Sequence, residues 1–143
     1  MDSARVLLRE AIGACLQRVL KVNGFATDAG AAFTLEPGQV DASAEAVMTV
    51  LLLKQERAAQ AALLRTHRLT TVGVVIKLPA PPDDEQGRLE AAISDIERAL
   101  DGQQARFAAG IEYPQYVSME PVKPEAGTGW VGALLTYQSH IPK

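Results

Sequence analysis

The stretch VMTVLLL at residues 47–53, followed by QERAAQAALLR at residues 55–65, decides the fold of this chain. The first run is rich in strand formers and is long enough for a buried strand. The second run has strong helix propensity, and the apolar spacing is also compatible with one helix over residues 44 to 65. We predict a strand over residues 45 to 56, followed by a loop or a single helical turn.

Three more strands are predicted downstream of this stretch. Residues 72 to 78 place a large apolar side chain at every second position, which is the pattern of a strand with one buried face. The proline-rich segment 79–82 ends it, because proline cannot donate to a sheet ladder. Residues 116 to 122, between prolines, predict an edge strand, and residues 130 to 141 predict a long final strand. The apolar faces of the second and last of these four strands consist of Val72, Val74, Ile76 and Leu78, and of Val131, Ala133, Leu135, Tyr137 and Ile141.

Two helices are predicted from apolar residues spaced three and four apart. The first covers residues 3 to 22, with Asp2 or Ser3 as N-cap and Asn23-Gly24 at its end. The second covers residues 83 to 100, where Asp83 and Gln86 resemble a capping box and Gly102 is the expected C-cap. The apolar stripes are Leu8, Ile12, Cys15, Leu16, Val19 and Val22 in the first helix, and Leu89, Ile93, Ile96 and Leu100 in the second.

With a short strand expected over Ala32 to Leu35, the element order is α-β-β-β-α-β-β. We therefore predict a single α+β domain over residues 1–143, in which an antiparallel (mixed) sheet carries both helices on one face. The opposite face is expected to hold Leu52, Val75 and Leu134. That is more apolar surface than a solvated face needs, which indicates a partner surface.

Composition excludes several functional classes. The net charge of −3 argues against a basic nucleic-acid binder, and no apolar run is long enough to span a bilayer. A single cysteine, Cys15, leaves no internal disulfide and is expected to be a small apolar core residue. Charged residues near the N-terminus argue against a signal peptide. We expect a cytosolic protein that contacts neither a membrane nor a specific DNA sequence.

Candidate catalytic and metal-binding residues are sparse. His67 and His140 lie far apart without a cysteine or carboxylate at ligand spacing, so we interpret them as two partly exposed imidazoles. Glu90, Asp95 and Glu97 are assigned to the polar face of the second helix. No catalytic residue, metal or cofactor is predicted.

Three other polar segments have ordinary explanations. Asp83-Asp84-Glu85 places negative charge at a helix N-terminus, which the helix dipole favours. Gly127-Thr128-Gly129 is predicted to be a hairpin turn, because it is too short for a phosphate loop. Arg65, His67 and Arg68 form a basic cluster at a strand end, where solvation is expected and contact with a partner or with DNA phosphates is the alternative.

The segment after the first predicted helix resembles the N-terminal part of a known protein family. It reads Asn23-Gly24-Phe25-Ala26-Thr27-Asp28-Ala29-Gly30. Small tail-terminator or tail-completion proteins of tailed bacteriophages and prophages begin with a helix, a turn of the type N-G-aromatic-x-T-D-x-G, and strands. The resemblance continues through the arginine-containing segment 65–68, the strand at 72–78, the helix ending DIERAL at 95–100, and the closing strand from Gly129 to Ile141.

This resemblance implies a structural protein of the virion tail, assembled in the bacterial host cytoplasm. Such proteins cap the tail tube, present a surface to the head, and form rings of six subunits. The implied partners are further copies of the chain, tail-tube proteins and head-connector proteins. A ring needs a heterologous interface, for which the apolar sheet face and the edge strand at 116–122 are candidates. The residues expected at such interfaces are Phe25, Asp28, Arg65, Arg68, Tyr116 and Trp130.

Two other readings remain open from the sequence. The chain is alternatively a small oligomeric cytosolic binding module or regulator without catalysis. It is also compatible with an enzyme whose site is assembled at a subunit interface. A ring of fixed size favours the tail protein, whereas a dimer favours the module. A deep pocket with convergent polar groups is expected for an enzyme.

Overall fold

The computed structural model describes residues 2–34, 47–79, 85–122 and 130–143. Short 3-10 turns lie at Lys21–Asn23, Ala29–Ala32, Ala61–Leu63 and Gln104–Arg106. The helices and strands, in chain order, are α1 (Ala4–Leu16), β1 (Val47–Arg57), β2 (His67–Pro79), α2 (Glu85–Leu100), β3 (Gln115–Val122) and β4 (Trp130–Pro142).

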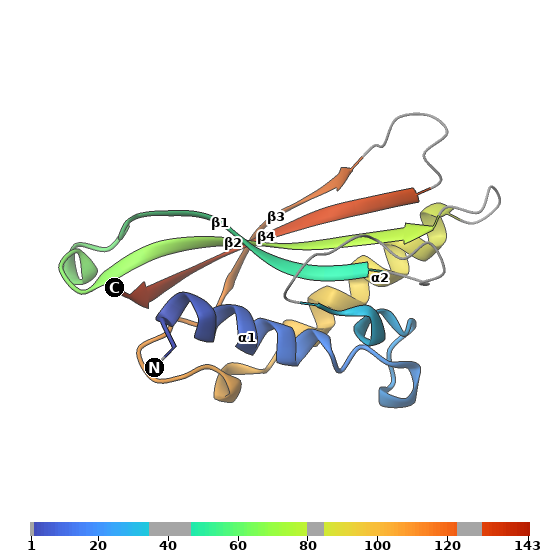
Figure 1. Ribbon diagram of the computed structural model, residues 1–143, viewed down its shortest axis with the longest axis horizontal. Coiled ribbons are helices and arrows are strands. Elements are labelled where there is room, and N and C mark those ends of the chain that lie inside the picture. Colours follow the sequence, from blue (N-terminus) through green and yellow to red (C-terminus); the bar gives the residue numbers. More distant parts are fainter. Residues whose placement is uncertain (1, 35–46, 80–84, 123–129) are drawn as a thin grey trace.

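The four strands form one antiparallel sheet in the order β1-β2-β4-β3, so β1 and β3 are its edge strands. Both helices lie against the same face of this sheet (Figure 1). The predicted α+β class is confirmed. The one parallel element among the described residues is an isolated bridge between Phe33 and Met48.

The core lies between the sheet and the two helices. On β2 and β4 the predicted alternating sets are buried, and they meet the buried stripes of both helices in one cluster. Full burial of one such leucine or isoleucine contributes roughly 2 kcal/mol. The apolar periodicity of α2, β2 and β4 therefore identified most of the core correctly.

The deciding stretch is a strand, as predicted, and the alternative of one long helix is excluded. β1 pairs with β2 from Val47 opposite Lys77 to Arg57 opposite Arg68, and the single turn Ala61–Leu63 follows. The helix formers of residues 55–57 continue the strand because their backbone is held in this ladder. A bulge between Leu52 and Lys54 interrupts the register.

The predicted first helix runs six residues too far at its C-terminal end, because α1 ends at Leu16. Val22, assigned to its buried stripe, is 88% exposed. The amide of Gly30 donates to the carbonyl of Val19 at 2.9 Å, and a Cβ on Gly30 would lie 2.5 Å from the carbonyl oxygen of Leu16. A later segment thus occupies the position of the next helical turn.

The predicted strand over Ala32 to Leu35 is also wrong in its described part. Residues Ala29–Ala32 form a 3-10 turn, and Phe33 makes only the isolated bridge. The amide of Thr34 donates to the carbonyl of Met48 at 2.9 Å, whereas Leu35 lies outside the described residues.

Other boundaries differ less. β2 begins at His67, five residues before the predicted start, because its first residues pair with the end of β4. The predicted left-handed glycine is confirmed at Gly102, with a φ of 69°. Asp83 and Asp84, which belong to the predicted capping box and acidic segment, and the predicted turn Gly127-Thr128-Gly129 lie outside the described residues.

Candidate functional site

The turn of residues 23–30 is held in place by α2. Asp95 is buried, and its carboxylate accepts hydrogen bonds from the amide of Ala26 at 3.1 Å and from the amide and hydroxyl of Thr27 at 2.8 and 2.7 Å. Asp95 was assigned to the polar face of the helix, and that prediction is wrong. The carboxylate faces inward because it replaces water as the partner of three donors.

Phe25 and Asp28 take part in the same anchoring. The Arg98 guanidinium lies over the Phe25 ring, 5.1 Å from its centre, and forms an ion pair with Asp95 at 3.7 Å. The carboxylate of Asp28 accepts a hydrogen bond from the amide of Lys21 at 2.8 Å. Both residues expected at an interface therefore have contacts within the chain that account for their presence in this turn.

A hollow of about 490 Å³ opens beside this turn, between it and the first half of α2. Its polar lining includes Lys21, Asp28 and Arg88, and its apolar floor includes Leu78 and Ala92. Lys21, Asp28 and Arg88 are not buried, so the described lining of the hollow offers charge for binding but no arrangement for proton transfer.

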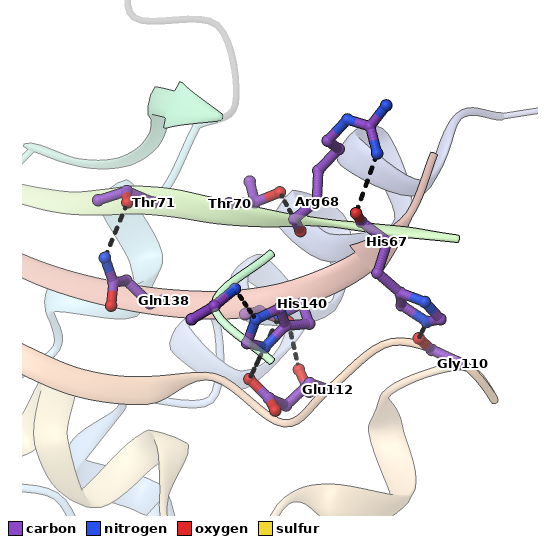
Figure 2. Close-up of polar contacts among 10 residues, drawn as sticks. His67, Arg68, Thr70, Thr71, Gly110, Glu112, Gln138 and His140 are labelled. Carbon is purple, nitrogen blue, oxygen red and sulfur yellow. Dashed lines mark hydrogen bonds and ion pairs between the residues drawn. The ribbon is translucent and has the colours of Figure 1, made fainter. Parts of the chain in front are cut away.

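His140 is buried at the other end of the sheet, and the prediction of a partly exposed imidazole is wrong for it. The amide of Ala59 donates to its Nε2 at 3.1 Å, which requires a neutral ring with the proton on Nδ1. Nδ1 lies 3.2 Å from a carboxylate oxygen of Glu112 (Figure 2). Because both ring nitrogens are occupied, His140 joins three chain segments and has no free nitrogen for catalysis.

His67 lies at the start of β2 and is half-buried. Its Nε2 is 3.2 Å from the carbonyl oxygen of Gly110, toward which the ring points in Figure 2. Arg68 donates to the carbonyl of His67 at 3.1 Å, whereas Arg65 is exposed in the turn before β2. The predicted basic cluster is thus a strand end, with Arg65 directed to solvent.

Tyr116 lies on the edge strand β3 and is 52% exposed, with its ring edge-on to Tyr137 at a centre distance of 5.7 Å. Trp130 is the first residue of β4 and pairs with Pro79. The expected interface residues therefore do not form one patch. The turn of residues 23–30 and the β1–β2 turn lie toward opposite ends of the molecule in Figure 1, and Tyr116 lies on a separate edge.

The sheet face away from the helices is partly apolar. Val75 and Leu134 are directly paired there, as predicted, and both are half-buried. Leu52 is opposite Val72 and therefore belongs to the helix side, which corrects its assignment. Leu53 takes its place: a Cβ on Gly73 would lie 2.6 Å from Leu134 and 3.0 Å from Leu53, so both leucines cover this glycine.

Reactive groups are few in the part of the chain that the structure describes. It contains no cluster of three or more His, Cys, Asp or Glu able to hold a metal ion. Cys15 is buried in the core, as predicted, and burial raises the pKa of its thiol. None of the described helices is long and apolar enough to cross a membrane.

Comparison with protein-family models and with curated proteins gave no match to this chain.

Proposed function

We propose that this chain is a structural subunit of a bacteriophage tail that assembles into a closed ring, caps the tail tube and joins it to the head. The proposal rests on the resemblance of the turn at residues 23–30 and its flanking elements to tail-terminator proteins. It is supported by one structural observation, which is that the sheet ends in two edge strands of compatible direction. Thr34 and Arg9 contact the backbone of β1 at Met48 and Val50, and among the described residues the rest of β1 and the outer side of β3 pair with no further strand.

The direction of the edges follows from the strand order. Every neighbour pair in β1-β2-β4-β3 is antiparallel, so β1 and β3 run in opposite directions. When a second copy is placed beside the first by rotation about an axis along the strands, its β1 lies antiparallel to the first copy's β3. This contact joins two different surfaces and repeats from copy to copy, as a ring requires.

Both edges carry exposed apolar side chains. Leu52 and Leu53 on β1 are 43% and 44% exposed, and Tyr116 and Val117 on β3 are 52% and 47% exposed. A monomeric protein usually protects a sheet edge with charge, proline, a bulge or a covering segment. These edges have part of that protection, because Lys54 lies on β1, Pro121 lies on β3 and each strand contains a bulge. Aromatic and apolar residues at an open edge are instead typical of the centre of a protein interface.

The first experiment measures the mass in solution by size-exclusion chromatography with light scattering. A six-membered ring has a mass of about 92 kDa, six times the 15.3 kDa subunit. We expect a single species with the mass of this ring, and particles with a central opening in electron micrographs. A monomer or an open dimer contradicts the proposal.

The second experiment tests the edges. Leu53→Lys and Val117→Lys introduce a charge at the two edges and are expected to convert the ring to monomers while circular dichroism remains unchanged. Val22→Lys is the matched control, because Val22 is more exposed than either residue and lies in the 3-10 turn Lys21–Asn23, away from both edge strands. Equal behaviour of all three variants contradicts edge-to-edge assembly.

The role in the tail needs its own test. Co-expression with the tube protein of the same genome is expected to give tubes that carry this ring at one end in electron micrographs. Uncapped tubes of variable length contradict the assignment. The alternative of a small oligomeric binding module is favoured by one feature, the open hollow with Lys21, Asp28 and Arg88. A dimer that binds a charged small molecule there supports that alternative.

A further inference from the structure

A second hollow, of about 460 Å³, lies between the end of α2 and the edge strand β3. Tyr113, Tyr116 and Tyr137 form its aromatic wall, and Glu97 and Asp101 stand at its rim. Tyr137 is buried and Tyr116 packs edge-on against it, so the wall is built from ordered rings. The two carboxylates are exposed, which leaves them free to meet a ligand from outside.

The chemistry of this hollow suits a guanidinium group. Aromatic faces attract a cation, and a carboxylate binds the planar fork of arginine through two parallel hydrogen bonds. Burial and then the negative charge of Glu97 raise the pKa of Tyr137, so its phenol stays neutral and the negative charge comes from the carboxylates alone. Among the described residues, neither Glu97 nor Asp101 has an ion-pair partner.

The opposite edge of the sheet carries the matching charge. Arg5 is exposed on α1, and its guanidinium donates to the side chain of Gln55 on β1 at 3.2 Å. In the described part of the chain no carboxylate forms an ion pair with it. Across the sheet, Gln55 pairs with Thr70, and Thr70 pairs with Ser139 on β4. Ser139 is two residues along β4 from Tyr137, which pairs with Tyr116. Arg5 and the hollow are therefore on the same sheet face, at similar heights along the strands and at opposite edges.

Each of these charges is disfavoured by its own helix. Arg5 lies in the first turn of α1, which contains no acidic residue, although the helix dipole there favours negative charge. Glu97 lies in the last turn of α2 and Asp101 follows its end, where the dipole favours positive charge. The positive charge of Arg5 and the negative charges of Glu97 and Asp101 are therefore not explained by their own helices, and they are complementary to each other in a contact between copies.

We propose that the tyrosine-lined hollow of one copy binds the Arg5 side chain of the next copy in the ring. The inference rests on the proposed ring, and it names the contact that holds neighbouring copies together on the helix side of the sheet. Edge pairing of β3 with β1 of the next copy brings the end of α2 next to the start of the neighbouring α1.

The test is a charge exchange measured by sedimentation velocity over a range of protein concentrations. Arg5→Glu alone, and Glu97→Arg with Asp101→Arg, are each expected to raise the dissociation constant of the ring at least tenfold. The combination of all three substitutions is expected to restore assembly, because the pairing is reversed and not removed. Lys21→Glu is the control for Arg5→Glu, and Glu10→Arg with Glu90→Arg is the control for the double variant, since they make equal charge changes at exposed positions outside the hollow.

The outcomes separate this inference from the proposed function. A wild-type ring that all variants form equally well overturns the Arg5 contact and leaves the ring intact. A wild-type monomer overturns both. Should charge reversal unfold the chain, Glu97→Gln with Asp101→Asn keeps the side-chain shapes, and an unchanged dissociation constant for that pair overturns the contact as well. Restoration in the triple variant supports it.

Discussion

Asp95 is the residue on which the position of the turn at 23–30 depends. Its carboxylate is buried and accepts hydrogen bonds from two backbone amides and one hydroxyl of that turn. Hydrogen bonds to a charged acceptor contribute more than those between neutral groups, so the cost of removing the carboxylate exceeds that of an ordinary surface change.

We expect Asp95→Ala to lower the free energy of unfolding by about 3 kcal/mol, because it removes the buried, charged acceptor of three hydrogen bonds and the ion-pair partner of Arg98. Glu90→Ala, on an exposed position of the same helix, is expected to change it by less than about 0.5 kcal/mol. Urea denaturation measures both. A cost for Asp95→Ala as small as that of the control contradicts the anchoring role.

Tyr137 makes stability depend on pH in the alkaline range. Burial raises its pKa above the ordinary value of 10.0, with the Glu97 charge as the next cause. Above pH 10 the unfolded state loses the phenol proton while the folded state keeps it, so the unfolded state binds fewer protons and stability falls as pH rises. Below pH 10 both states are protonated and this contribution is constant.

We therefore expect Tyr137→Phe to flatten the decline of unfolding free energy between about pH 10 and pH 11.5, by roughly 1.4 kcal/mol per pH unit at most. The comparison is made relative to the value of each protein at pH 8, so that any constant effect of the lost hydroxyl is removed. Parallel curves for the two proteins rule out this linkage.

At the level of elements, the periodic spacing of apolar residues identified the helix and the strands whose one face is buried. The stripe of α2 and the alternation of β2 and β4 each needed only apolar residues at regular spacing, and these residues are buried. The end of α1 was not predictable in this way. It depends on the segment around Gly30, which lies fourteen residues after the end of α1 and packs against the carbonyl of Leu16, where the next helical turn would continue.

The candidate site was predicted less well than the fold, for a related reason. Asp95 is bonded to residues 68 and 69 positions earlier, and His140 is bonded to Ala59, 81 positions earlier. The residues next to it in the sequence do not distinguish a polar residue with such a distant partner from an ordinary surface residue. The turn at residues 23–30 stood out by its resemblance to a family, but its contacts with Asp95 and Arg98 were not predicted.

Gly30 and Gly24 allow a test of how α1 ends. A Cβ on Gly30 meets backbone carbonyls that cannot move aside, so we expect Gly30→Ala to cost about 2–3 kcal/mol. Gly24 has a φ of 90° with open space around it, and Gly24→Ala is expected to cost only about 1 kcal/mol of backbone strain. Thermal and urea unfolding compare the two variants, and an equal cost contradicts the steric account.

At the scale of the whole molecule, the sheet has two strands, β2 and β4, that are paired on both sides, and two edge strands, β1 and β3. Among the described residues the outer sides of the edge strands pair with no further strand, apart from the bridge of Phe33 to Met48. Hydrogen exchange distinguishes these classes. In the proposed ring, amides of β1 and β3 are expected to be protected as well as those of β2 and β4. In the Leu53→Lys variant, the edge amides that do not bond within the sheet are expected to exchange faster, while β2 and β4 stay protected. Rapid exchange at both edges of the wild-type assembly contradicts edge pairing.

The bulges in β1, between Leu52 and Lys54, and in β3, between Tyr116 and Ser118, lie at the two edges of the sheet, on either side of the row that pairs Val72 with Tyr137. An inserted residue bends its strand and sharpens the local twist. In the proposed ring, the same bend repeated at every junction turns each copy by a fixed angle relative to the last, and we expect that angle to set the number of copies that close the circle. Deleting Leu53 is then expected to straighten each junction, and electron micrographs of that protein to show open-ended filaments of indefinite length.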